Sequence, residues 1–232
     1  MLFLENIETL KAVGIFGGTF DPVHIGHLRT AVELREHLGL DELHLMPSAR
    51  PPHREQPGVS AEHRLAMLQL AIDGELQGNG FATGGLVADD RELRREGLSY
   101  TVETLAQLRG ELGSDVALCL CIGMDSLVNL HTWQRWQALG DYAHLVVAAR
   151  PGWHLPETGP VAEWLAGRCT DDPQLLSQSP SGRVLVEAMT LLPVSATKIR
   201  KDLAAGSSVR YLVPDAVIQY IHQHGLYKRE SS

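Results

Sequence analysis

The chain has 232 residues, of which 44% are hydrophobic, and this is enough for one α/β domain with a substantial core. Its formal net charge of −8 argues against general nucleic-acid binding, because such proteins usually carry a basic face. No apolar run approaches the roughly 18 residues of a membrane span, and the N-terminal segment lacks the pattern of a signal peptide. Three cysteines (Cys119, Cys121 and Cys169) are too few for a disulfide framework, so we expect free thiols and a cytoplasmic protein.

Strand-like and helical patterns alternate along the chain, which is typical of a mostly parallel sheet with helices on both faces. We therefore expect a Rossmann-like, doubly wound α/β fold in a single domain over 1–232, with its core at about 12–227 and a helical C-terminal part at 195–227. The expected strands are 12–16, 42–46, 86–88, 116–122, 143–149, 184–186 and 189–192. The expected helices are 28–38, 60–73, 101–112, 195–206 and 214–223, and the segment 153–181 is expected to be an insertion at the rim of the sheet.

The first expected strand leads into the run GGTFDPVHIGH, residues 17–27. Gly17 and Gly18 lack a Cβ, so the backbone can turn sharply and a ligand can approach its N–H groups, while Gly26 leaves room for a flat or bulky group. His24 and His27 are three residues apart and would point to one side from the first helical turn, as hydrogen-bond donors for an anion. Two solvated histidines or a metal pair are the alternatives, but no HxxE or CxxC that could supply a third ligand stands nearby.

This run resembles the signature of the nucleotidyltransferase superfamily, in the form found in bacterial nicotinate mononucleotide adenylyltransferases. The resemblance implies adenylyl transfer from ATP to nicotinate mononucleotide, which gives nicotinate adenine dinucleotide and pyrophosphate in NAD biosynthesis. It also implies Mg²⁺ that bridges the phosphates and has few protein ligands. The ATP contacts implied in this run are Gly17, Gly18, Thr19, Phe20, His24, Gly26 and His27.

A proline-punctuated basic loop follows the second expected strand. A surface connection would explain it, but the resemblance places His53 and Arg54 beside the mononucleotide phosphate, although the family often has lysine where Arg54 stands. The charged run 89–96 is expected to be a solvated face.

The third long helix begins within Ser99-Tyr100-Thr101. Ser99 and Thr101 have the residue types of helix caps, and capping alone would explain them. The resemblance adds that this segment receives the nicotinate end of the substrate, for which free N–H groups at a helix start would suit a pyridine carboxylate.

Four further candidates follow the apolar strands 116–122 and 143–149, where ligands bind in open α/β sheets. Gly123 and Asp125 are implied nucleotide contacts, and Asp125 is also a candidate N-cap. Trp133 and Trp136 are expected on one helix face; Trp136 is assigned to the core and Trp133 to the nicotinate ring. Arg150 ends the later strand and matches an R-P-G turn of the family.

The second phosphate-binding segment is Pro193 to Arg200. Ser195 is expected to cap a helix, Thr197 to donate a hydroxyl and an N–H group, and Lys198 and Arg200 to supply positive charge. The segment resembles the I-S-S-T-x-I/L-R motif of the family, except that Ala196 replaces the second serine.

The expected mechanism is in-line attack of the mononucleotide 5′-phosphate on the α-phosphorus of ATP. The acceptor is already an anion, so no general base is needed, and His24, His27 and Arg200 would act by positioning and by stabilising charge. Another adenylyltransferase, acting on phosphopantetheine or nicotinamide mononucleotide, remains an alternative, as does a non-catalytic ATP sensor. An aminoacyl-tRNA synthetase is disfavoured by the charge, and a homo-oligomer is left open.

Overall fold

The computed structural model describes residues 9–48, 58–76, 85–95, 97–150, 152–190 and 192–228. The described part contains a seven-stranded sheet in the order β3-β2-β1-β4-β5-β7-β6, and every strand pair in it is parallel. The strands are β1 Lys11–Gly18, β2 Glu42–Pro47, β3 Leu86–Ala88, β4 Val116–Gly123, β5 His144–Ala149, β6 Cys169–Thr170 and β7 Val184–Ala188. This architecture confirms the expected Rossmann-like fold.

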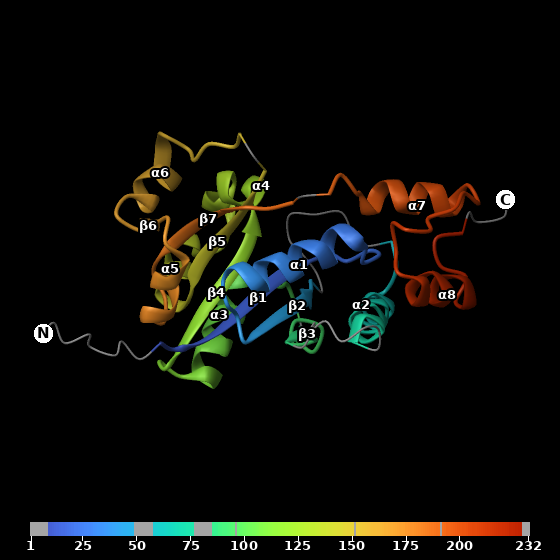
Figure 1. Cartoon of the computed structure of the whole chain (residues 1–232), viewed down its shortest axis with the longest axis horizontal. Coiled ribbons are helices and arrows are strands. Elements are labelled where there is room, and N and C mark those ends of the chain that lie inside the picture. The colour runs from blue at the N-terminus through green and yellow to red at the C-terminus, as the bar shows by residue number, and fades with distance from the viewer. Residues whose placement is uncertain are drawn as a thin grey trace, which may run out of the picture.

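Helices cover both faces of the sheet (Figure 1). One hydrophobic cluster packs α1 and α2 against the sheet together with α7 and α8, and a second cluster packs α3 to α6 against the opposite face. The α-helices are α1 Ile25–His37, α2 Ala61–Leu76, α3 Thr101–Leu112, α4 Met124–Val128, α5 Leu139–Tyr142, α6 Gly159–Leu165, α7 Ala196–Ala204 and α8 Asp215–Gln223. Short 3₁₀ turns occur at η1 Leu130–Thr132, η2 Trp136–Ala138 and η3 Pro173–Gln178.

The strands alternate their side chains between the two clusters, as the pleat of a strand requires. In β4, Cys119 and Cys121 face the α1 side whereas Leu118 and Leu120 face the α3 side, and all four are buried. Both thiols are free, as expected. Continuous burial of a strand is the mark of the centre of a parallel sheet.

The order of the strands reverses between β1 and β4. From β1 the chain proceeds to β2 and β3 on one side, and β4 then returns to the other side of β1. Such a switch point leaves a crevice at the carboxyl ends of the two strands, where open α/β sheets bind their ligands. The register that pairs Phe16 with Cys121 places Gly17, Gly18 and Gly123 at this edge.

Two expectations about local structure were wrong. The strand expected over 189–192 is absent from its described residues: β7 ends at Ala188, and Thr190 donates its N–H to the Glu33 carboxylate at 2.8 Å instead of to a neighbouring strand. The tryptophans do not share a helix, because Arg135 adopts a left-handed conformation between η1 and η2. The segment 153–181 lies at the rim of the sheet, as expected, because it contributes the edge strand β6 as well as α6 and η3.

The charged run 89–96 is not simply a solvated face. Asp89 and Glu92 are each only 8% exposed. Asp89 lies 2.9 Å from the His44 ring nitrogen and accepts a hydrogen bond from Arg91 at 2.8 Å, while Glu92 accepts one from the Thr104 hydroxyl at 3.0 Å. These carboxylates are buried because each has hydrogen-bond donors at hand.

In the described ranges, no helix is long and apolar enough to cross a bilayer.

Candidate active site

The two motif histidines form a stacked pair at the beginning of α1. Their ring centroids are 3.7 Å apart and the ring planes differ by 17°. His24 is the N-cap residue with extended backbone, and its Nδ1 accepts a hydrogen bond from the His27 N–H at 3.4 Å. Phe20 packs edge-on against the His27 ring at 5.0 Å. The pair therefore lies at the positive end of a helix dipole, in a geometry fixed by the loop and the first helical turn.

The His24 ring is neutral at physiological pH. It is 5% exposed, and this burial lowers its pKa to about 4. Because Nδ1 accepts a hydrogen bond, the proton of the neutral ring resides on Nε2, which is thus a donor. His24 can offer an N–H to an anion without carrying a full charge.

The glycines of the run have different roles. A Cβ at Gly17 would meet nothing within 4 Å, which agrees with an open approach to the backbone. A Cβ at Gly18 would lie 2.9 Å from the Phe20 ring, and one at Gly26 would lie 3.1 Å from the His24 ring. The space at Gly26 is therefore taken by His24, and the expectation that it admits a ligand group was wrong.

Phe20 and Thr19 were expected to contact ATP, but the structure shows Phe20 in the core and the Thr19 carbonyl bound to another part of the protein. Phe20 is 1% exposed and belongs to the core, so any contact it makes with a nucleotide comes from its main chain. The Thr19 carbonyl accepts a hydrogen bond from Arg64 of α2 at 2.7 Å. Arg64 is itself 1% exposed, and burial lowers its pKa. Arg64 was not predicted from the sequence, because its partner is a main-chain carbonyl 45 residues away and no local motif marks the pair.

Asp21 joins the two candidate phosphate-binding segments, residues 17–27 and 193–200. Arg200 of α7 donates from Nη1 to the Asp21 carbonyl at 2.7 Å, and the same nitrogen lies 3.5 Å from the Asp21 carboxylate. Val194 packs beside Gly26, whose Cβ would lie 3.5 Å from that of Val194. Segments about 170 residues apart in sequence thus meet beside the histidine pair.

The beginning of α7 largely has the expected form. Ser195 is the N-cap, and its hydroxyl accepts from the Lys198 N–H at 3.5 Å. Thr197 is exposed, and its hydroxyl accepts from Arg200 Nη2 at 3.4 Å. Lys198 turns back along the helix to Asp202 at 2.7 Å, so its ammonium group is engaged away from the first turn. The expected Lys198 phosphate contact would require this exposed ion pair to open.

Gly123 and Asp125 stand at the end of β4, across the switch point from Gly17. Gly123 is exposed and is the N-cap of α4, a role that the sequence analysis had offered to Asp125. Asp125 instead occupies the first turn with an exposed side chain.

The segment Ser99–Thr101 begins α3 at the same edge of the sheet. Tyr100, not Ser99 or Thr101, is the N-cap residue, and no side chain caps this helix. The first N–H groups of α3 thus donate no hydrogen bond to a capping side chain. This correction leaves the helix start with donors that a carboxylate could use.

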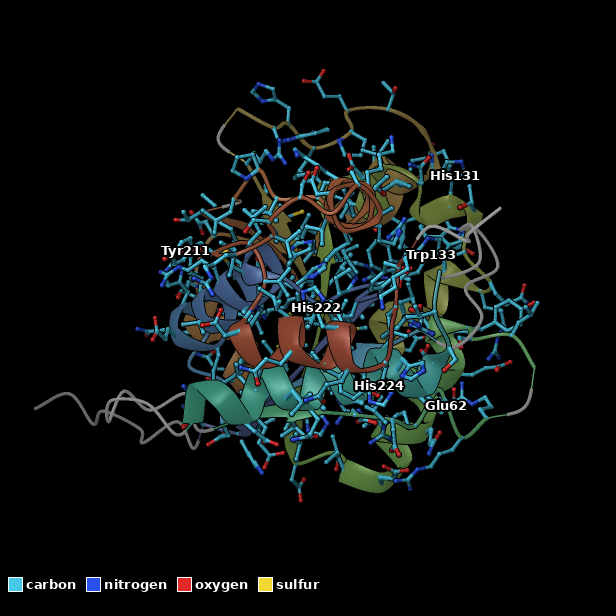
Figure 2. The ribbon with its side chains drawn as sticks, turned by 90° about the vertical axis from the view of Figure 1, so that its right-hand side faces the viewer. Glu62, His131, Trp133, Tyr211, His222 and His224 are labelled. Carbon is cyan, nitrogen blue, oxygen red and sulfur yellow. The ribbon has the colours of Figure 1, made fainter. Side chains whose placement is uncertain are left out.

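The two remaining candidates in the described residues lie on separate segments. Trp133 is half-buried against the cluster that contains α3, and Arg150 is exposed at the end of β5. In Figure 2, Trp133 lies on the right of the view and the exposed Tyr211 lies on the left. His53 and Arg54 lie outside the described residues.

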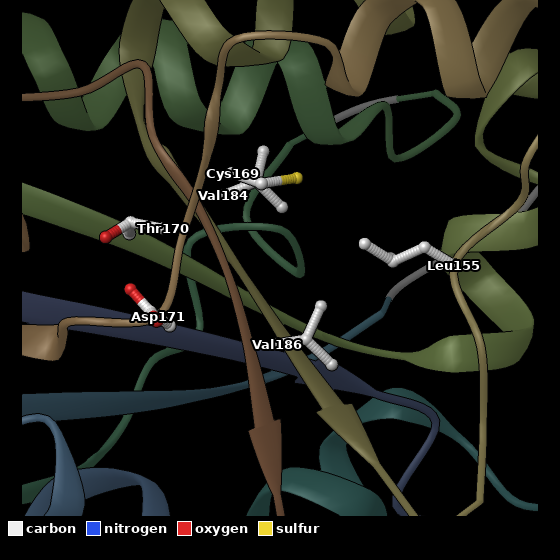
Figure 3. Close-up of a pocket in the computed structure, with 6 residues that line it drawn as sticks. All are labelled: Leu155, Cys169, Thr170, Asp171, Val184 and Val186. Carbon is white, nitrogen blue, oxygen red and sulfur yellow. The ribbon is translucent and has the colours of Figure 1, made fainter.

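A hollow of about 360 Å³ lies at the far edge of the sheet (Figure 3). Its lining residues are Leu155, Cys169, Thr170, Asp171, Val184 and Val186. None of them belongs to either phosphate-binding segment, so this hollow is not the candidate active site. In the described portion of the chain, no cluster of three or more His, Cys, Asp or Glu residues could hold a metal ion.

Comparison with known proteins agrees with this geometry. Residues 15–202 match the model of the family described as cytidylyltransferase-like. A protein of Pseudomonas aeruginosa named probable nicotinate-nucleotide adenylyltransferase is 50% identical over 218 residues, which cover 94% of this chain and 98% of that protein. One of Cellvibrio japonicus with the same name is 49% identical over 93% of this chain and 98% of its own length.

Solved structures share the fold at much lower identity. The structure of Plasmodium falciparum nicotinic acid mononucleotide adenylyltransferase complexed with NaAD superposes with a TM-score of 0.69, at 16% identity, and covers 94% of this chain and 97% of that one. A structure titled as a putative nicotinate-nucleotide adenylyltransferase from Vibrio parahaemolyticus gives a TM-score of 0.62 at 14% identity, with 95% and 98% covered.

Proposed function

This chain belongs to the nicotinate-nucleotide adenylyltransferases, within the cytidylyltransferase-like family, and we propose that the stacked histidine pair and the beginning of α7 carry its reaction. The enzyme transfers the adenylyl group of ATP to nicotinate mononucleotide in NAD biosynthesis, which gives nicotinate adenine dinucleotide and pyrophosphate. The observation that carries the residue assignment is that Arg200 binds Asp21, in the loop just before the stacked histidines, while Val194 packs beside Gly26 between them.

The reaction requires charge stabilisation more than proton transfer. The attacking 5′-phosphate is already an anion, so the histidines need not act as bases. His24 donates from Nε2, His27 lies nearest the transferred phosphoryl group, and Thr197 and Arg200 hold the β- and γ-phosphates. A guanidinium is suited to this because it binds phosphate oxygens through several N–H donors at once. The first N–H groups of α7 add a helix start of the kind that binds anions.

The acceptor occupies the α3 side of the crevice in this proposal. The N–H groups at the beginning of α3 receive the nicotinate carboxylate, with Ser99, Tyr100 and Thr101 around it. Trp133 stacks on the pyridinium ring, because an indole face attracts a cationic ring. Arg150, together with His53 and Arg54, binds the mononucleotide phosphate, and Asp125 accepts from ribose hydroxyls.

A divalent metal fits this site only as a companion of the phosphates. The described residues around the histidine pair are mainly hydrogen-bond donors, and the carboxylate of Asp21 is engaged by protein donors. We therefore propose that Mg²⁺ would accompany the triphosphate, with few protein ligands, and would neutralise phosphate charge there. A cytoplasmic location is favoured by the free thiols of Cys119 and Cys121.

The decisive experiment measures pyrophosphate release with ATP and Mg²⁺, with nicotinate or nicotinamide mononucleotide as acceptor. We expect fast release with the acid and little with the amide. His27→Ala should lower turnover by roughly 10²-fold or more, the scale of losing one charge-stabilising donor. His37→Ala, at the other end of α1, is the matched control and should leave turnover near that of the wild type. Equal rates with both acceptors would contradict the carboxylate site at α3, and a normal rate for His27→Ala would contradict the histidine assignment.

A further inference from the structure

Asp21 is a buried carboxylate that no step of the proposed reaction uses directly. Its side chain is 3% exposed. A carboxylate without water is costly unless its oxygens accept hydrogen bonds or face a cation. Here one oxygen accepts from the Tyr227 hydroxyl at 2.6 Å, and the other accepts from the Gly58 N–H at 2.7 Å and lies 3.5 Å from Arg200.

Tyr227 brings the C-terminal part of the chain into this network. It follows α8, and its backbone is in the left-handed region with φ of 57°, an uncommon conformation for a tyrosine. Burial, reinforced by the hydrogen bond to Asp21, raises the pKa of its phenol. The hydroxyl is therefore protonated at working pH and serves as a permanent donor.

Gly58 lies against all three partners at once. An ideal Cβ there would be 3.4 Å from Asp21 Oδ2, 3.5 Å from Arg200 Cδ and 3.7 Å from a Tyr227 ring carbon. This shared contact shows that the carboxylate, the guanidinium and the phenol form one packed cluster.

The guanidinium of Arg200 is oriented by this cluster. Nη1 binds the carbonyl and faces the carboxylate of Asp21, and Nη2 binds the Thr197 hydroxyl. A guanidinium carries five N–H donors in a rigid plane, so fixing two nitrogens sets the direction of the rest. The Arg200 side chain remains 31% exposed, which leaves part of it open to a ligand.

We propose that Asp21 and Tyr227 are positioning residues: the phenol holds the carboxylate, and the carboxylate aims Arg200 at the β- and γ-phosphates of ATP. The inference rests on the proposed phosphate-binding role of Arg200 and extends it to the C-terminal tyrosine, whose hydroxyl binds Asp21. Positioning through Arg200 predicts selective loss of affinity for ligands that contain those two phosphates.

The chain offers a matched control for removing one hydroxyl. Tyr220 on α8 also makes one side-chain hydrogen bond, since its hydroxyl lies 2.9 Å from His63 Nδ1 on α2. The ring of His63 is also 5.2 Å from that of His224, which Figure 2 labels near Glu62. This α2–α8 contact does not include Asp21 or Arg200, so Tyr220→Phe perturbs the same part of the fold without disturbing the guanidinium.

The test is calorimetric titration of wild type, Tyr227→Phe and Tyr220→Phe with ATP and, separately, with AMP. We expect Tyr227→Phe to weaken ATP binding about 5- to 10-fold, the scale of one typical hydrogen bond. AMP binding should change less than about twofold, and Tyr220→Phe should leave both affinities near wild type. Asp21→Asn is the second variant, and it should also weaken the binding of ATP more than the binding of AMP. Thermal melts establish that each variant is folded.

A double-mutant cycle separates positioning from general structure. In an Arg200→Ala background, Tyr227→Phe should have almost no further effect on ATP binding, because it acts through the missing guanidinium. Equal weakening of ATP and AMP, unchanged ATP binding in Tyr227→Phe, or full additivity with Arg200→Ala would each overturn the inference. Failure of pyrophosphate release by the wild type would instead contradict the proposed function, since these binding measurements need no turnover.

Discussion

Replacing His24 with asparagine should change how the stability of the protein depends on pH. Asparagine is among the best N-cap residues, and its side-chain oxygen can accept from the His27 N–H as Nδ1 of His24 does. The substitution therefore keeps the helix cap and removes a buried group that titrates. The free energy of unfolding is the quantity to compare between the two proteins.

The sign and size follow from the pKa of His24. Burial lowers it to about 4 in the folded state, against about 6.5 for a histidine in an unfolded chain. Between pH 6.5 and pH 4, His24 is protonated in the unfolded chain but not in the folded protein. The free energy of unfolding therefore decreases as the pH is lowered through this window. The full difference corresponds to roughly 3 kcal/mol, of which roughly 2 kcal/mol is already lost at pH 5.

Urea unfolding of both proteins at pH 8, 6.5 and 5 measures this. Between pH 8 and pH 5, the wild type should lose about 2 kcal/mol more than His24→Asn. His144 is also buried, and burial lowers its pKa, but it is present in both proteins and its contribution cancels in the comparison. A stability difference that stays constant over this range would refute the assignment of His24 as a buried, neutral ring.

Two further predictions concern residues around the site and the sheet. Gly18→Ala should destabilise the protein by about 1–3 kcal/mol in chemical unfolding, because its Cβ would lie 2.9 Å from the Phe20 ring. Gly17→Ala is the control and should change stability little, because a Cβ there has nothing within 4 Å. Equal losses of stability in the two variants would contradict this packing. His44→Gln should cost more stability at pH 5.5 than at pH 9, because the hydrogen bond to Asp89 raises the pKa of His44. That contribution is complete below the unfolded pKa and disappears as the pH rises through the folded one, so a loss that grows with pH would count against the ion pair.

Local patterns in the sequence were sufficient for most of the fold. The apolar runs and the residues that begin and end helices located β1, α1, β4 and α7 because these elements are determined by periodicity and capping. The GGTFDPVHIGH run placed both histidines at the start of a helix for the same reason. A glycine turn, a proline and a helix start are properties of neighbouring residues.

Where the sequence analysis failed, the outcome depended on partners far along the chain. Asp89 and Glu92 of the charged run are buried because His44 and Thr104 supply donors. Thr190 donates its N–H to Glu33 instead of pairing in the expected strand. None of these partners is marked by a local pattern.

The sequence by itself determined the fold class and the family, and it singled out the two candidate phosphate-binding segments. Periodicity and motifs are properties of residues that are close together along the chain. Only the tertiary structure decided how those segments meet. Asp21 bonds Arg200, Gly58 and Tyr227, groups up to 206 residues away, and Arg64 reaches the carbonyl of Thr19. A buried charge must find its donors wherever the fold brings them, and that requirement selects partners in space and not along the chain.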